Sequence, residues 1–404
     1  MSGFIARQPI FDQSMNVYGY ELLYRSGLQV NAFDGTVNAD TASTETIINS
    51  FHGIGIEKLT NKKHAFINFT EKLLLSGVAT LFPKDELVIE LLEDIVPSER
   101  VLFACQALRD KGYMLALDDF IIQESQLPLL DIANIIKIDF LSTPLDVIYQ
   151  FVQSVKDRPI KLLAEKVENN KVYQIANAMG FSYFQGYFFS KPVTMNDKQV
   201  DPLVMNRLRI IRLIMQPNYD FWGLSNIIKQ DVAFSYRLLR LVNSSFFGFS
   251  TTVKSLRQAL AILGVEEIKK WVTLVSMMDI RKGGPDELIR MSLIRGRFME
   301  LIAPHVKMAR QVEELYLTGL LSLIDAILEQ PKEDIFQQIN LADTITRPLL
   351  TGEGRAAEIL KIILFYEQGE FQEAVKLGIQ CGISGEQLQN LYLEALEWVN
   401  MLEI

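Results

Sequence analysis

The sequence predicts an α/β barrel domain followed by an all-helical domain. The chain has 404 residues, more than one hydrophobic core usually supports. In its first half, short apolar runs alternate with segments of helical spacing, as expected for parallel strands joined by crossover helices. In its second half we find no convincing strand, only apolar residues three and four positions apart. We therefore expect two domains, residues 1–195 and residues 196–404.

The first half opens with a hairpin and continues with six buried strands. A turn at residues 12–16 joins predicted strands at residues 4–10 and 17–24. Six apolar runs follow, and each of them ends in a polar or ionisable residue. These runs are residues 65–68, 87–90, 114–119, 135–137, 161–165 and 181–185. Helical spacing predicts helices at residues 41–51, 71–75, 98–110, 145–155 and 170–179.

The second half is predicted to consist of consecutive helices. Apolar spacing favours helices over most of its length, with breaks at Gly248, Gly264, Gly283 and Pro331. The predicted helices are residues 203–215, 224–229, 234–242, 253–263, 265–278, 287–302 and 312–328, and short amphipathic helices continue to the last residue.

Composition limits the classes of partner. The net charge is −9, and neither half has the basic surplus that sequence-independent nucleic-acid binding requires. Cys105 and Cys381 are far apart and lack metal-ligand spacing, which favours a reduced compartment. The most hydrophobic later stretch, residues 315–328, is too short to span a bilayer and contains Asp325. We expect a cytoplasmic protein without a nucleic-acid or membrane partner.

Polar residues at the strand ends predict a metal site. In a β/α barrel the carboxyl ends of the strands share one rim, where chemistry is done. Carboxylate and amide oxygens suit Mg²⁺ or Mn²⁺, and a lysine beside them can stabilise charge on a phosphate. The candidate ligands are Glu21, Asn68, Glu90, Asp118 and Asp119, with Lys137 on the next strand and Glu165, Glu168 and Gln185 binding or orienting from the remaining strands.

Each of these residues also has a purely structural interpretation. Asn68 could cap the helix that begins near Thr70, and Lys137 could form a local ion pair with Asp139. A single acid at a strand end is commonly a helix cap or a surface charge. Six strand ends that all carry potential ligands or charged residues are harder to explain as caps and surface charges, and they favour the metal site.

The same motifs resemble the EAL domain, a bacterial phosphodiesterase domain that acts on cyclic di-GMP. The resemblance covers about residues 3–192 and includes the segments 7–10, 20–25, 90–93, 118–120, 137–139, 165–168 and 185–188 with Asn68. It implies a modified (β/α)₈ barrel with an antiparallel first strand, and hydrolysis of cyclic di-GMP to pGpG with Mg²⁺ or Mn²⁺. It places metal ligands on Glu21, Asn68, Glu90, Asp118 and Asp119, catalytic roles on Lys137 and Glu165, and substrate contacts on Arg25, Glu168 and Gln185.

Two departures from the family pattern leave catalysis open. The usual glycine-rich loop after the Asp-Asp-Phe motif is replaced by residues 121–127, and in the family that loop couples dimerisation to metal binding. Lys166 stands where the family usually has glycine, and an ammonium there could partly substitute for the second metal. The intact ligand positions favour a metal-dependent phosphodiesterase of reduced activity, which hydrolyses cyclic di-GMP weakly. The departures favour a catalytically inactive receptor for cyclic di-GMP or a protein-interaction scaffold, and a homodimer is the usual arrangement.

The second half resembles the HDOD domain, an all-helical relative of the HD phosphohydrolases that is generally regarded as non-catalytic. The resemblance runs from about residue 203 to the end and is most specific at residues 235–245 and 255–264. None of the three histidines is followed by Asp, which excludes an HD-type binuclear metal site. The resemblance implies a domain that relays or scaffolds the output to an unidentified protein partner. Asn243 is the expected buried polar anchor.

Overall fold

The chain is divided into two compact units in the computed structural model. One unit comprises residues 1–189 and 361–389, and the other comprises residues 190–360 and 390–404. The predicted helices at residues 41–51 and 224–229 lie outside the residues that the structure describes. The described residues are 4–25, 28–30, 37–39, 55–118, 120, 126–190, 207, 209–211, 213–214, 232–243, 253–280, 286–339 and 341–402.

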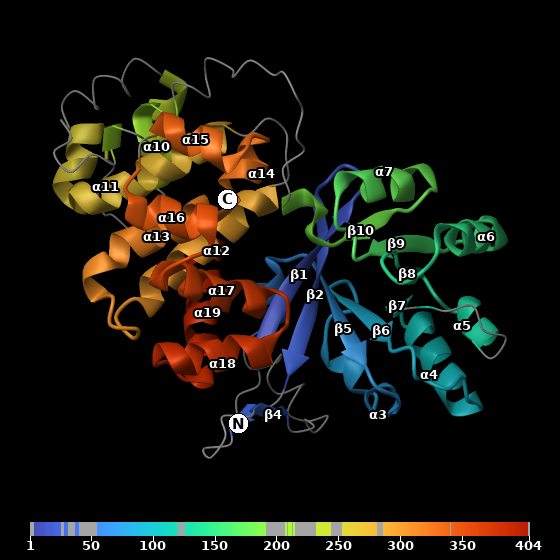
Figure 1. Cartoon of the computed structure of the whole chain (residues 1–404). Helices are drawn as coiled ribbons and strands as arrows, with labels where there is room; N and C mark the ends of the chain where they lie inside the picture. The colour runs from blue at the N-terminus through green and yellow to red at the C-terminus, as the bar shows by residue number, and fades with distance from the viewer. Residues whose placement is uncertain are drawn as a thin grey trace. The chain divides into compact units, whose positions relative to one another are not determined.

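A closed eight-stranded barrel forms the centre of the first unit (Figure 1). Its first strand is antiparallel to both neighbours, β2 and β10, and all other neighbouring strands are parallel. The predicted α/β barrel with an antiparallel first strand is therefore confirmed. In order around the barrel the strands are β1 (Phe4–Asp12), β10 (Tyr183–Gln185), β9 (Lys161–Glu165), β8 (Ile135–Asp139), β7 (Met114–Leu117), β6 (Leu87–Leu91), β5 (His64–Phe69) and β2 (Val17–Arg25).

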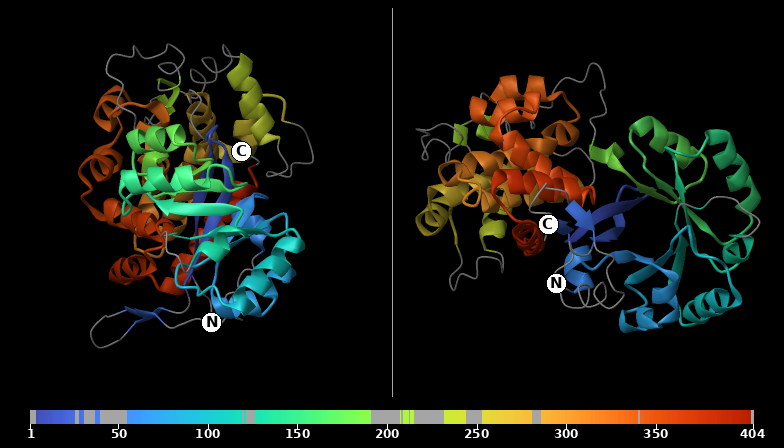
Figure 2. Two further views of the ribbon diagram at one scale, coloured as in Figure 1. Left: turned by 90° about the vertical axis from the view of Figure 1, so that its right-hand side faces the viewer. Right: turned by 60° about the horizontal axis from the view of Figure 1, so that its bottom comes forward.

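Helices lie on the outer side of the barrel (Figure 2). The helix predicted from residue 98 begins there, since the side chain of Ser98 accepts a hydrogen bond from the Val101 amide at the start of α4. The helices are α2 (Ile56–Thr60), α3 (Glu71–Leu75), α4 (Glu99–Asp110), α5 (Leu127–Leu130), α6 (Leu145–Val155) and α7 (Asn170–Ala178), and β3 (Leu28–Val30) pairs with β4 (Val37–Ala39) in a separate sheet.

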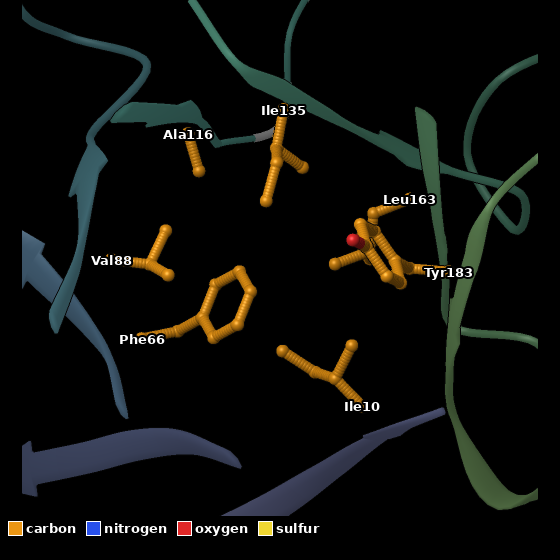
Figure 3. Close-up of a cluster of buried hydrophobic side chains, with 7 residues drawn as sticks. All are labelled: Ile10, Phe66, Val88, Ala116, Ile135, Leu163 and Tyr183. Carbon is orange, nitrogen blue, oxygen red and sulfur yellow. The ribbon is translucent and has the colours of Figure 1, made fainter. Parts of the chain in front are cut away.

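An apolar layer fills the barrel interior (Figure 3). Seven of the eight strands each contribute one buried side chain, and Tyr18 of β2 packs against the layer. At Gly19 of β2, a Cβ atom would lie 2.9 Å from the Phe66 ring, so a larger residue does not fit there. The seven buried side chains are Ile10, Phe66, Val88, Ala116, Ile135, Leu163 and Tyr183.

A C-terminal segment also belongs to the barrel unit. Residues 361–389 include the end of α17 (Arg355–Glu367), α18 (Phe371–Cys381) and the start of α19 (Gly385–Asn400). The ring of Phe4 on β1 lies 5.6 Å from the ring of Phe371 and 6.3 Å from that of Tyr366. The barrel unit therefore uses residues far beyond the proposed domain boundary near residue 195.

The described part of the second unit is entirely helical. Gly264, with φ 80°, interrupts α11 at the break that the sequence predicted. The single helix predicted at residues 312–328 is wrong, because a 3₁₀ turn at Leu321–Leu323 divides it, and apolar spacing does not reveal such a turn. The helices are α10 (Val232–Val242), α11 (Leu256–Ile280), α12 (Asp286–Ile302), α13 (Val312–Leu320), α14 (Ile324–Leu328), α15 (Lys332–Ile339) and α16 (Asp343–Thr351), with parts of α17 and α19.

None of the helices in the described ranges has both the length and the apolar character that crossing a bilayer requires.

Asn243 links the end of α10 to the segment that precedes α11. Its amide nitrogen donates to the carbonyls of Leu239 and Val253, each at 2.8 Å, and its amide oxygen accepts from the Val253 amide at 2.6 Å. The residue is exposed, so the expected burial is wrong, but the side chain does connect the two segments.

Replacing Asn243 by alanine should lower the free energy of unfolding of the second unit by about 1–3 kcal/mol, because three hydrogen bonds are lost and the Val253 amide is left unpaired. Denaturant titration followed by tryptophan fluorescence measures the change, since Trp271 and Trp398 both lie in this unit. Asn390→Ala, an exposed position on α19, is the matched control and should change stability little. Equal stability of the two variants would contradict the assignment.

Candidate functional site

A polar layer stands directly above the apolar layer of the barrel. Side chains alternate along a strand, so a residue two positions beyond an apolar-layer residue faces the same interior. From β5 to β10 these residues are the predicted Asn68, Glu90, Asp118, Lys137, Glu165 and Gln185. On the antiparallel pair, Gln8 of β1 is the register partner of Glu21 of β2. Strand register therefore brings together side chains that are widely separated in the sequence.

Lys137 lies at the centre of four carboxylates. Its ammonium nitrogen is 2.7 Å from Asp118, 2.8 Å from Glu90, 2.9 Å from Glu165 and 3.4 Å from Glu21. The lysine is fully buried. Burial by itself lowers the pKa of Lys137, but the surrounding carboxylates raise it well above its ordinary value, so the side chain stays charged.

Two acids of this cluster, Glu90 and Glu165, hold their protons more strongly than an exposed glutamate does. Burial raises the pKa of Glu90 well above its ordinary value, against the opposing effect of Lys137. Burial also raises the pKa of Glu165 to about 8, with Lys137 lowering it and Asp118 and Glu21 raising it. Four ionised carboxylates and one ammonium would carry a net charge of −3. Bound protons or a divalent cation would offset this excess.

Several oxygens in the layer are free to bind a cation. Asn68 Oδ1, Glu90 Oε2 and Glu165 Oε2 are buried and have no hydrogen-bond partner. Buried polar atoms normally have partners, and a hard divalent cation, which prefers oxygen ligands, would supply one for these oxygens. Within the described ranges, no three His, Cys, Asp or Glu side chains are already placed to hold one ion. The carboxylates converge on the Lys137 ammonium instead.

The structural alternatives for Asn68 and Lys137 do not hold. Thr70, not Asn68, caps α3, because its side chain accepts from the Leu73 amide at 3.3 Å. Asp139 pairs with Lys166 at 2.5 Å rather than with Lys137. The ammonium inside the acid cluster is therefore that of Lys137, whereas Lys166 is half exposed and lies against Asp139.

Gln185 holds Glu21 in place. Its amide nitrogen donates to Glu21 Oε2 at 2.7 Å and to Gln8 Oε1 at 3.1 Å. The next residue, Gly186, has φ 140°, and a Cβ atom there would lie 2.3 Å from the Val167 carbonyl oxygen. Only glycine permits this close approach, which lets the Val167 amide donate to the Gln185 carbonyl and fixes the end of β10.

Two predicted site residues lie elsewhere. Glu168 is exposed on the loop after β9, and Arg25 is at the end of β2, so neither belongs to the four carboxylates around Lys137. Asp119 lies outside the described residues, as do residues 121–125 of the altered loop.

A pocket of about 420 Å³ lies at the end of β2 and β5. Its lining includes Arg25 and Asn68, which the sequence singled out. It also includes Gln368, Gly369 and Phe371 from the C-terminal segment of the same unit. No sequence motif pointed to these three residues, which lie more than 180 positions after the end of the last barrel strand at Gln185. Gln8 lies in the segment 7–10, which contributes to the EAL resemblance, but only the strand register reveals its contact with Gln185.

Comparison with known proteins supports a two-part organisation. The family model of the EAL domain matches residues 50–192, and that of the HDOD domain matches residues 201–344. Protein YuxH of Bacillus subtilis is 36% identical over 410 residues, covering 100% of this chain and 99% of that protein. The cyclic di-GMP phosphodiesterase CdgJ of Vibrio cholerae is 33% identical over 397 residues, covering 98% of this chain and 92% of that protein.

Solved structures give a weaker likeness. The Bacillus subtilis YkuI protein, solved with its EAL domain in complex with cyclic di-GMP and calcium, is 19% identical with a TM-score of 0.38, covering 65% of this chain and 73% of that chain. A standalone EAL protein from Vibrio cholerae, in its cyclic di-GMP-bound form, is 23% identical with a TM-score of 0.36, covering 47% of this chain and 92% of that chain.

Proposed function

Because the chain belongs to the family of proteins that join an EAL domain to an HDOD domain, we propose that its barrel binds cyclic di-GMP with Mg²⁺ or Mn²⁺ and hydrolyses it to pGpG. The observation that carries this proposal is the buried carboxylate cluster with its unpartnered oxygens. Glu21, Asn68, Glu90, Asp118 and Asp119 are the proposed metal ligands. A divalent cation, when bound, would supply Lewis-acid activation of the phosphodiester and of the attacking water.

The residues of the cluster fit the proton transfers of hydrolysis. Water attacks the phosphorus, the bond from phosphorus to the ribose 3′ oxygen breaks, and that oxygen takes up a proton as the 3′ hydroxyl. Glu165 has a pKa raised to about 8 chiefly by burial, and it would receive the proton of the water once cation binding has released its own. Lys137 would stabilise the negative charge that develops on the phosphate, and Arg25 would hold the phosphate at the rim.

A second candidate function is binding without turnover. It is favoured by the position of the Lys137 ammonium, which lies within 2.9 Å of Glu90, Asp118 and Glu165. While the lysine stays there, it offsets part of the charge that a divalent cation would otherwise offset. A barrel in this state would act as a receptor or as a scaffold.

We also propose that the HDOD half passes the cyclic di-GMP signal to a protein partner, either by relaying it or by acting as a scaffold. A homodimer is the oligomeric state that we propose. A cytoplasmic location is supported by the two cysteines, Cys105 and Cys381, which are free and buried.

Incubation of the full chain with cyclic di-GMP and Mn²⁺, followed by chromatography of pGpG, tests turnover, and calorimetry in Ca²⁺ tests binding. We expect Glu21→Gln to reduce turnover at least a hundredfold, because it replaces an anionic proposed ligand, which also accepts the Gln185 hydrogen bond, by a neutral amide. Glu57→Gln, at an exposed position of α2, is the matched control. If the chain binds cyclic di-GMP but forms no pGpG, the receptor function is supported instead. If it neither binds nor hydrolyses cyclic di-GMP, the proposed nucleotide site is rejected.

A further inference from the structure

The pocket beside the acid cluster has walls from two distant parts of the chain. One wall is formed by residues 22–25 of β2 with Ile67 and Asn68 of β5. The other is the turn between α17 and α18, represented by Gln368, Gly369 and Phe371. Both walls belong to the same compact unit. The turn lies outside the ranges matched by the EAL and HDOD family models, so neither family assigns a role to it.

The turn is held firmly against the first two strands. Phe371 packs against Phe4 and Tyr366, with ring centres 5.6 and 5.1 Å away. Gly369 has φ 77°, and a Cβ atom there would lie 2.7 Å from Leu23 Cδ1. Since a side chain at this position would be strained and crowded, glycine allows the turn to approach β2 closely. Its place in the pocket wall is therefore defined by packing on both sides.

The turn also contacts the polar layer of the barrel. The amide nitrogen of Gln8 lies 3.5 Å from the carbonyl oxygen of Glu367, the last residue of α17. Gln8 in turn accepts a hydrogen bond from Gln185, which donates to the proposed ligand Glu21. Two side chains thus separate the C-terminal turn from Glu21.

The chemistry of the pocket fits one half of a cyclic dinucleotide. Its volume of about 420 Å³ falls within the range of small-molecule sites. Arg25 provides a cation for a phosphate, and Asn68 joins the pocket to the metal-ligand layer. Leu22, Ile67 and Phe371 supply apolar surface for a purine ring. Gln368 is exposed, and its amide is both a donor and an acceptor for the edge of the base.

We propose that the α17–α18 turn is part of the nucleotide site and that Gln368 hydrogen-bonds the edge of one guanine of cyclic di-GMP. The inference rests on the proposed function of the barrel and assigns a base-contacting residue to it. The amide of Gln368 donates to O6 of the guanine and accepts from its N1–H. The complete site then requires the C-terminal segment, and the barrel strands by themselves leave one side of the base uncovered.

Calorimetry of the full chain in Ca²⁺ tests this contact with two ligands. One ligand is cyclic di-GMP, and the other is its analogue in which both guanines are replaced by 2-aminopurine, which lacks O6 and the N1–H. Gln368→Ala should weaken cyclic di-GMP binding about five- to tenfold and analogue binding less than twofold. Gln380→Ala, exposed on α18 and outside the pocket lining, should change neither.

The outcomes separate this inference from the proposed function. If the wild-type chain binds cyclic di-GMP and Gln368→Ala binds it equally well, the contact is rejected while the function stands. Equal weakening of both ligands would also reject it, because a structural disturbance does not distinguish between bases. If the wild-type chain binds neither ligand, the proposed function itself fails, and the inference fails with it.

Discussion

Replacing Lys137 by methionine should lower the free energy of unfolding of the metal-free barrel unit by about 3–5 kcal/mol. Lys137 is the cation that the four carboxylates of the cluster share, and three of them lie within 2.9 Å of it. Without it, Glu90, Asp118 and Glu165 would face one another in a buried site. The deficit should shrink at low pH, where these acids are protonated, and on addition of millimolar Ca²⁺, which would take the place of the ammonium.

Hydrogen exchange measured by mass spectrometry on peptides from β8 and β9 is the suitable assay. The three tryptophans, Trp222, Trp271 and Trp398, all lie outside the barrel unit, so fluorescence does not report on it. Lys166→Met is the matched control, because it removes the half-exposed partner of Asp139 and should cost less than about 1 kcal/mol. If the β8 and β9 peptides of metal-free Lys137→Met exchanged hydrogen no faster than those of the wild type, the Lys137 ammonium would not be what stabilises the acid cluster.

The affinity of the barrel for Ca²⁺ should increase with pH up to about pH 8 and then level off. Glu165 has a pKa raised to about 8, chiefly by burial, so it carries a proton at neutral pH in the metal-free protein. A carboxylate ligand or neighbour of an ion must be ionised, so binding releases this proton. Each proton released makes the affinity change about tenfold per pH unit below the pKa.

The same raised pKa determines how stability depends on pH in the absence of metal. Between the ordinary value of 4.5 and about 8, the folded protein retains the Glu165 proton that the unfolded chain has lost. Because the folded state then binds more protons, its free energy of unfolding falls as pH rises through this window. The contribution of Glu165 is therefore fully present below pH 4.5 and lost above about pH 8. Saturating Ca²⁺ should remove most of this dependence.

Calorimetry at several pH values, repeated in two buffers of different ionisation enthalpy, counts the protons released. Glu165→Gln should reduce the count by about one, whereas Glu168→Gln, at an exposed position, should leave it unchanged. An affinity that does not change between about pH 6 and pH 8 would show that Glu165 is already ionised without metal, and this would contradict its raised pKa.

Much of the fold was predictable because local patterns determine it. The alternation of apolar strands with amphipathic helices predicted the barrel, and α3 and α6 have the predicted bounds. The break at Gly264 was also visible, because glycine at a positive φ ends a helix. The 3₁₀ turn at Leu321–Leu323 was not, since its residues are as apolar and buried as those of the helices beside it.

The residue types at the strand ends by themselves determined which side chains meet at the barrel rim, because parallel strands align their ends and alternate their faces. Glu90, Asp118 and Lys137 needed no tertiary information to be grouped. Only the tertiary structure decided that the Lys137 ammonium lies at the centre of the acids and that Lys166 pairs with Asp139. It also decided that Gln368 borders the pocket. Side-chain reach and the return of a distant segment depend on packing across the whole unit, and no local pattern in the sequence encodes either of them.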